Sequence, residues 1–208
     1  MLKFVIAIGL GLRFLYASTA LIWGAARSRT RKIKFENFAN QLKLSYLAES
    51  EDIENQFAKF TLIAAGHNHV DRNYLTGQTK AGKIKIFDYH YEVGHGENLI
   101  LRDFSLLSIE LKSSEQNLAI WPKSMVSSLP LQPGLVVGEI GNHVYTGDQT
   151  ICKKIIDLIG LTFPESSKDI AIEATDSKIL QFSPIGPISK LCLEKRIDFC
   201  CKVRELID

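Results

Sequence analysis

Glycine, proline and cysteine are all sparse in this 208-residue sequence, with 14, 6 and 4 residues respectively. These counts exclude a collagen-like chain and a disulfide-stapled scaffold. The formal net charge is +2, so neither sign of charge is in large excess. Hydrophobic residues make up 46% of the chain. That composition excludes a disordered chain. A chain of this length can bury a full hydrophobic core, so it needs no metal or disulfide to fold.

Short catalytic motifs are also missing from the sequence. It contains no G-x-S-x-G nucleophile elbow, no G-x-x-x-x-G-K-[ST] phosphate loop and no G-x-G-x-x-G after a predicted strand. The two Gly-x-Gly pairs fall at 9–11, within an apolar segment, and at 94–96, in an expected hairpin turn. We therefore assign no catalytic, cofactor-binding or metal-binding residue from motifs, and we expect no cofactor.

Charge is divided unevenly along the chain. Residues 1–34 hold seven basic and no acidic side chains, which leaves 18 basic and 23 acidic side chains in residues 35–208. A protein face that binds nucleic acid must be basic, because it contacts phosphates. The net negative charge of residues 35–208 therefore argues against nucleic acid as a partner.

The first segment of the sequence is typical of a membrane-spanning helix. Between Phe4 and Ala26 the only charged side chain is Arg13, and Trp23 lies where an interfacial aromatic is common. A helix of this length spans the hydrocarbon core of a bilayer. The pattern predicts a transmembrane anchor over residues 1–26, in contact with the lipid bilayer.

Basic residues after this span set its predicted orientation. Five of them lie in the juxtamembrane segment 27–34, whereas Lys3 alone precedes the span. Because cytoplasmic flanks carry the excess of lysine and arginine, the amino terminus is expected outside. The prediction is a single-pass protein of the cell inner membrane, with residues 35–208 as a cytoplasmic α+β domain.

A stripe of small residues around Arg13 indicates a helix partner. Small residues at helical spacing let another helix approach closely, either a membrane partner or a second copy of this chain. The stripe consists of Gly9, Arg13, Ala17, Ala20 and Gly24. Alternatively, Arg13 lies near the interface of a tilted anchor. Two other interpretations of the segment are a signal peptide cleaved near 17–20 and a soluble amphipathic helix.

Residues 35–208 show helical and strand periodicity in separate runs, without strand–helix alternation. The predicted helices are 33–44, a short turn after Ser50, 148–159 and 187–206. The predicted strands are 60–65, 73–79, 83–93, 99–111, 118–121, 143–146, 169–174 and 178–182. This order predicts an α+β fold, in which one domain with a mostly antiparallel sheet packed by helices follows the N-terminal transmembrane helix.

Along the expected strand over 83–93, the apolar residues move from one face of the strand to the other. Ile84 and Ile86 share one face, whereas Phe87 and Tyr89 share the other. Its expected partner strand changes phase in a similar way. The change indicates either a β-bulge or a strand that is buried on both faces.

The four cysteines show no C-x-x-C spacing; they are Cys152, Cys192, Cys200 and Cys201. Three of them fall on apolar stripes of predicted helices, which is typical of small buried thiols. A disulfide that includes Cys152 and a zinc site are the alternatives.

Three stretches of the sequence are distinctive in combination. They are the basic-flanked N-terminal segment with a helix ending Leu42-Lys43-Leu44, the strand Asn73-Tyr74-Leu75-Thr76-Gly77 and the strand Phe87-Asp88-Tyr89-His90-Tyr91. Together they resemble an uncharacterised family of bacterial single-pass membrane-anchored proteins. The resemblance implies an α+β domain in which the N-x-L-x-G and F-D-Y-x-Y strands are neighbours. The sequence departs from the family at 66–72, where members mostly have small and basic residues. The family has no established activity, so the resemblance implies no catalytic residue.

One histidine-rich stretch is a candidate metal site. His67, His69 and Asp71 alternate along the chain, and residues two apart on a strand face the same way, so these side chains could bind one metal ion. His90 could join them if the two strands are adjacent. Arg72 follows directly, and its cation would repel a bound metal. The alternative interpretation is a polar turn.

A second polar group lies on the strand that carries Asp88. His90 and Glu92 share the same strand face, with His95 just beyond. A histidine between carboxylates could act as a general base. The alternative is the polar face of a strand whose aromatic residues pack inward, with Asp88 hydrogen-bonded to a neighbouring backbone or to Arg102.

The sequence favours a non-enzymatic interaction or assembly module at the inner membrane, with an unidentified protein partner. This hypothesis combines a predicted anchor and a complete core with the lack of a convincing catalytic set. The alternative is a metal-assisted hydrolase that uses His67, His69, Asp71 and His90. Enzymatic activity is therefore left open, with the balance against it.

Overall fold

The computed structural model describes residues 28–50, 53–79, 82–112, 117–126, 138–175, 177–186 and 188–208. Its strands are β1 (Ser45–Leu47), β2 (His67–Thr79), β3 (Gly82–Val93), β4 (Ile100–Glu110), β5 (Leu118–Pro122), β6 (Gly138–Ile140), β7 (His143–Thr146), β8 (Ala171–Thr175) and β9 (Lys178–Pro184). Its helices are one over 28–42, α2 (Ile53–Phe57), α3 (Lys123–Val126), α4 (Gln149–Thr162) and α5 (Lys190–Ile207).

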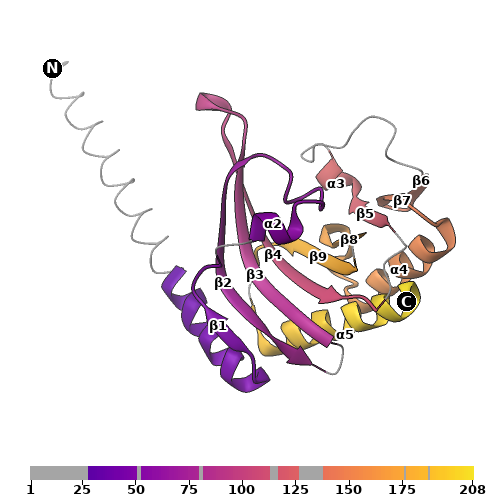
Figure 1. The fold of residues 1–208 in the computed structure, drawn as a ribbon. Coiled ribbons are helices and arrows are strands. Elements are labelled where there is room, and N and C mark those ends of the chain that lie inside the picture. The colour runs from indigo at the N-terminus through magenta and orange to yellow at the C-terminus, as the bar shows by residue number, and fades with distance from the viewer. Residues whose placement is uncertain are drawn as a thin grey trace, which may run out of the picture.

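The described residues form an α+β fold around one nine-stranded sheet (Figure 1). The strand order is β1-β2-β3-β4-β9-β8-β5-β7-β6, and each neighbouring pair is antiparallel. The chain builds β1 to β4 as consecutive neighbours, and β9 then continues the sheet beside β4. The pairs β2–β3, β3–β4, β6–β7 and β8–β9 are consecutive in the chain and joined by short connections, which suit antiparallel pairing.

Both faces of the sheet are covered by apolar packing. On one face, here called the helical face, the helix over 28–42, α4 and α5 bury residues such as Phe35, Ile155 and Phe199 against Ile84 of β3. On the opposite face, α2, α3 and the turns between α2 and β2 pack on the sheet through residues such as Phe57. A sheet buried on both faces explains why its central strands read as nearly continuous hydrophobic runs.

The apolar residues of β3 move from one face to the other because the strand is buried on both faces. Ile84 and Ile86 belong to the core of the helical face, whereas Phe87 and Tyr89 belong to the core of the opposite face. The register of β3 with β4 runs without a shift from Ile84 to Val93. The irregularities lie instead in β2, whose register with β3 shifts twice.

Each shift in β2 contains an asparagine in the left-handed region. Asn68 has φ of 52° and Asn73 has φ of 55°. Asparagine tolerates this conformation better than most residues with a side chain, so it suits a bulge. The two bulges change which side chains of β2 point to the helical face.

The predicted strand over 60–65 was wrong. These residues form turns, in which the amide of Ile63 donates to the carbonyl of Phe60 at 3.1 Å and that of Ala65 donates to Leu62 at 3.3 Å. Phe60 and Leu62 are buried. They are apolar because the turns fill the core of the opposite face, and β2 begins at His67, earlier than the predicted start at residue 73.

The fold class predicted from the sequence was wrong in its N-terminal transmembrane helix. No helix among the described residues is long and apolar enough to cross a bilayer. The helix over 28–42 is too charged, since Arg29, Arg31, Lys32 and Lys34 lie in its first turns. The described part of the chain is therefore an α+β fold without a helix that could span a membrane, and the single-pass membrane prediction was wrong for these residues. Residues 1–26, which include the expected helix contact at Gly9, Arg13, Ala17, Ala20 and Gly24, lie outside the described residues.

Candidate functional site

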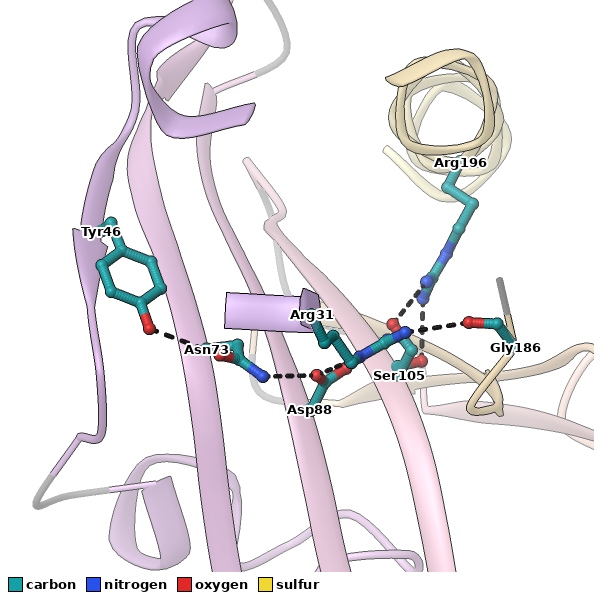
Figure 2. Close-up of polar contacts among 7 residues, drawn as sticks. All are labelled: Arg31, Tyr46, Asn73, Asp88, Ser105, Gly186 and Arg196. Atoms are coloured by element: carbon teal, nitrogen blue, oxygen red, sulfur yellow. Dashed lines mark hydrogen bonds and ion pairs between the residues drawn. The ribbon is translucent and has the colours of Figure 1, made fainter. Parts of the chain in front are cut away.

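A bidentate ion pair joins the helix over 28–42 to the sheet (Figure 2). Arg31 donates from Nε to Oδ2 of Asp88 at 2.5 Å and from Nη2 to Oδ1 at 2.6 Å. Its remaining terminal nitrogen donates to the carbonyl of Gly186 at 2.9 Å. The Asp88 side chain is 7% exposed and that of Arg31 is 13% exposed, so water screens the pair little. Helix, β3 and the segment after β9 meet at this pair.

The second bulge of β2 extends this network toward the sheet edge. Asn73 donates from Nδ2 to Oδ2 of Asp88 at 2.9 Å, and Tyr46 of β1 donates its hydroxyl to Oδ1 of Asn73 at 3.3 Å. Asn73 is the asparagine of the N-x-L-x-G stretch, and Asp88 is the aspartate of the F-D-Y-x-Y stretch. Those stretches lie on neighbouring strands, and their polar side chains contact each other on the helical face (Figure 2).

A second arginine, Arg196 of α5, approaches the same region of the sheet (Figure 2). It is 5% exposed. Its Nε donates to Oε1 of Gln181 at 2.6 Å, while Nη1 and Nη2 donate to Oγ and the carbonyl of Ser105 at 2.8 and 2.9 Å. Burial lowers the pKa of Arg196 from its ordinary value, because the charged form loses hydration. An arginine nevertheless stays protonated.

Two cavities adjoin the Arg31–Asp88 pair. Cavity 1, of about 400 Å³, is lined by Ser28, Arg31, Val70, Arg72, Asn73, Asp88, Tyr89, His90, Asp103 and Ile185. Cavity 2, of about 360 Å³, is lined by Arg31, Ser105, Phe163, Ser166, Asp169, Ile170, Ser183, Pro184, Ile185, Gly186, Ile188, Cys192 and Arg196. Arg31 and Ile185 line both cavities, so the ion pair lies between them. These volumes lie within the range of small-molecule sites, which is about 300–1,000 Å³.

The predicted metal-binding stretch does not converge on one point. His67 lies 3.7 Å from a carboxylate oxygen of Glu92 and stacks on His95, with ring centroids 4.7 Å apart. His69 instead contacts the hydroxyl of Tyr89. The first bulge of β2, at Asn68, separates these two side chains and breaks the strand alternation that the prediction assumed.

Asp71 has a structural role in the described fold. Its Oδ2 accepts from the backbone amide of Ser50 at 2.9 Å, which holds the segment between β1 and α2 against β2. Burial raises the pKa of Asp71, and the hydrogen bond from Ser50 opposes that rise. Across the described ranges, no three His, Cys, Asp or Glu side chains are grouped so as to hold a metal ion.

The predicted acid–base group around His90 is only partly assembled. His90 Nδ1 lies 3.0 Å from Oδ1 of Asp103 on β4, and its Nε2 lies 4.0 Å from Glu92. Asp88 is not part of this contact, because it pairs with Arg31. Among the described residues, no hydrogen bond joins the Asp88 side chain to the backbone or to Arg102, which were its expected partners. His90 and Asp103 line cavity 1 and supply polar groups at one side of it.

The cysteines are free thiols on helices. Cys152 and Cys200 are buried, whereas Cys192 and Cys201 are half-buried. Burial raises the pKa of Cys152 to about 11 and also raises that of Cys200. Cys192 differs from the other three because it lines cavity 2.

Sequence reasoning missed both arginines of the site. Arg31 was assigned to a basic membrane flank, and its partner Asp88 is 57 residues away. Arg196 left a usable signal, because it occupies one stripe of α5 with Leu193, Phe199 and Val203, all of which are buried. A single cation within an apolar helical stripe indicates a buried charge that needs polar partners on the facing sheet.

The fold and site together define an α+β protein with a nine-stranded antiparallel sheet and two cavities beside a buried ion pair. No family model and no curated protein matches the sequence. Among solved structures, the chain is similar to the crystal structure of the mycobacterial trehalose monomycolate transport factor A, TtfA. The TM-score is 0.61 at 12% sequence identity, over 85% of this chain and 93% of that chain. At this identity the likeness shows a shared fold.

Proposed function

We propose that the chain is a non-enzymatic interaction module that takes part in lipid transport by holding a lipid in cavities 1 and 2. The observation that carries the proposal is the pair of adjoining cavities, about 400 and 360 Å³, at one ion pair. A protein of the same fold is a transport factor for a lipid, trehalose monomycolate, which supports the same role.

The lining of the cavities suits a molecule with a polar and an apolar part. Cavity 2 has an apolar wall that includes Phe163, Ile170 and Ile188, together with three serines and two arginines. Cavity 1 is more polar, since Asp88, Asp103 and Arg72 line it. Ligand sites generally combine apolar walls with a few polar groups that fix orientation. A lipid has both kinds of surface.

Blocking the site tests the proposal. Ile185 lines both cavities and is half-buried, so Ile185→Trp is expected to fill space that a lipid would occupy. The matched control is Leu191→Trp, which adds the same side chain at a position that is 63% exposed. Binding of didodecanoyl phosphatidylglycerol and phosphatidylethanolamine to the full chain is measured by native mass spectrometry.

The expected result is one bound lipid per chain, reduced several-fold by Ile185→Trp and unchanged by Leu191→Trp. The apolar residues 4–26 are present in every variant, so lipid held by that segment would not distinguish the two substitutions. Equal binding by both variants would overturn the proposal, as would the lack of any bound lipid on the unaltered chain.

A further inference from the structure

Arg196 is a buried cation whose protein partners are all neutral. Its three acceptors among the described residues are the amide oxygen of Gln181 and the hydroxyl and carbonyl oxygens of Ser105. A guanidinium has five N–H groups, so two can still donate. Buried charges in proteins are generally paired with an opposite charge, because an isolated charge loses most of its hydration energy.

The carboxylate on the same side of the sheet is already committed. Asp88 attracts Arg196, but Arg31 repels it, and Asp88 and Arg31 form a bidentate pair with each other. The charge of Arg196 is thus left without a dedicated counter-ion in the described part of the chain.

Gln181 adds to the excess of hydrogen-bond donors. It is fully buried, its Oε1 accepts from Arg196, and its Nε2 has no hydrogen-bond partner among the described residues. A buried amide donor without an acceptor is rare in folded proteins. Among the described residues, Arg196 therefore makes no hydrogen bond to a carboxylate, and the amide donor of Gln181 beside it has no acceptor.

Cavity 2 reaches this donor-rich region. Arg196 and Ser105 line it, together with Arg31, Ser166 and Ser183. Asp169 is the carboxylate among its lining residues, and it is half-buried whereas Arg196 is 5% exposed. No ion pair joins Asp169 to either arginine within the described residues. Water screens Asp169 more than it screens Arg196, so the deeply buried charge near the sheet is positive.

We propose that cavity 2 binds the anionic head group of an amphiphile, a carboxylate or a phosphate, with Arg196 as its ligand and the apolar wall against its chain. The inference rests on the proposed function and specifies the charge and position of the lipid head. A planar, multivalent guanidinium is well suited to carboxylate and phosphate oxygens. Ser183 and Ser166 supply further donors to the same group.

Cys192 provides a readout in the unaltered protein. It lines cavity 2 and is half-buried, whereas Cys201 is equally half-buried on the same helix and does not line the cavity. The alkylation rate of each thiol by iodoacetamide is measured by mass spectrometry. The probes are dodecyl phosphate, dodecanoate, neutral dodecanol and inorganic phosphate. The two anionic amphiphiles are kept below the concentration at which they form micelles, and dodecanol is kept below its solubility limit.

Dodecyl phosphate and dodecanoate are expected to slow alkylation of Cys192 several-fold and to leave Cys201 unchanged. Dodecanol and inorganic phosphate are expected to protect Cys192 much less. Equal protection by dodecanol would overturn the anionic head group while leaving the proposed lipid role in place. Equal protection by inorganic phosphate would overturn the amphiphile in favour of a small anion, and failure of all four probes to protect Cys192 would overturn the site.

A pair of variants tests whether Arg196 binds the head group. Arg196→Gln removes the buried charge, and Lys195→Gln makes the same charge change at an exposed neighbouring position of α5. Arg196→Gln is expected to weaken binding of dodecyl phosphate about tenfold or more, as expected for a lost charged hydrogen bond, and Lys195→Gln is expected to change it little. Equal affinities of these two variants would overturn the assignment. If Arg196→Gln fails to fold, the thiol-protection result on the unaltered chain decides.

Discussion

Within the described residues, both faces of the sheet bury charged side chains, and cavities 1 and 2 adjoin those of the helical face. On the opposite face, Glu173 of β8 accepts from the amide of Thr61 at 2.7 Å and from Nε1 of Trp121 at 2.8 Å. On the helical face, Arg196 and the Arg31–Asp88 pair line cavities 1 and 2. Glu173 lines neither of these cavities, and its carboxylate is enclosed by the protein.

This difference separates a structural buried charge from a candidate site. Each oxygen of Glu173 has a donor within the fold, so the carboxylate fixes the turns after α2 against β5 and β8. Burial raises the pKa of Glu173, and the hydrogen bonds from Trp121 and Thr61 oppose that rise. Perturbed titration is therefore not enough to mark a binding site, since structural groups show it as well. Space for a ligand beside an uncompensated charge is the more informative feature.

The largest expected effect tests how far the helical face depends on its ion pair. Asp88→Asn leaves Arg31 buried without its carboxylate, and removing one partner of a buried pair destabilises a protein by about 3–5 kcal/mol. The matched control is Asp198→Asn, whose pair with Lys202 is exposed and screened by water, so its loss is expected to change stability little. The free energy of unfolding is measured in urea. Similar losses for the two variants would mean that the helix over 28–42 does not depend on this pair.

An intermediate effect is expected on the opposite face. Trp121→Phe removes the donor to Oε1 of Glu173, and an unsatisfied buried acceptor costs about 1–3 kcal/mol. The variant also raises the pKa of Glu173 further. Because a raised carboxyl pKa makes the folded state retain the proton longer than the unfolded state, stability falls as the pH rises above the ordinary value of 4.5. The loss levels off once Glu173 is ionised in the folded protein.

Unfolding curves of Trp121→Phe and the unaltered chain at several pH values measure this dependence. The difference between them should be smallest below pH 4.5 and should grow as the pH rises above that value. A difference that does not change with pH would show that Trp121 stabilises the protein through packing alone and that Glu173 is not its electrostatic partner.

The local pattern of apolar residues predicted many of the strands, and its errors arise where segments far apart in the sequence pack together. The strands around the hairpin at 94–96 were recognisable because β3 and β4 are neighbours in sequence and pair continuously. The turns at 60–65 were mistaken for a strand because core-filling apolar residues give the same local pattern in turns and strands. Apolar residues at every second position indicate which face of a strand is buried, but they do not tell which helix or turn covers that face.

The candidate site was harder to predict for a related reason. Arg31 and Asp88 come from separate elements, and neither has a local sequence pattern that specifies the other. Asp88 follows Ile84 and Ile86 on the helical face, so its position in an apolar alternation could have marked it as buried. The histidine pattern at 67–71 was more conspicuous but depended on a regular strand, and the bulge at Asn68 removes that regularity.

The smallest expected effect distinguishes the two bulges of β2. Asn68 and Asn73 share a positive φ, but the amide of Asn68 donates to Glu92 at an exposed position, whereas that of Asn73 donates to Asp88 in the buried network. Glycine adopts positive φ without strain, so a change to glycine mainly removes the side-chain hydrogen bond. Asn73→Gly is therefore expected to cost about 1 kcal/mol and Asn68→Gly close to nothing.

Alanine at the same two positions separates backbone strain from the hydrogen bond. Alanine in the left-handed region costs about 1–2 kcal/mol, so each alanine variant should be less stable than its glycine counterpart by a similar amount. Urea unfolding of all four variants gives both differences. If Asn73→Gly and Asn68→Gly are equally stable, the amide of Asn73 contributes nothing to the ion pair on the helical face. The polar network of that face would then depend on the direct pair of Arg31 and Asp88, without support from the bulge of β2.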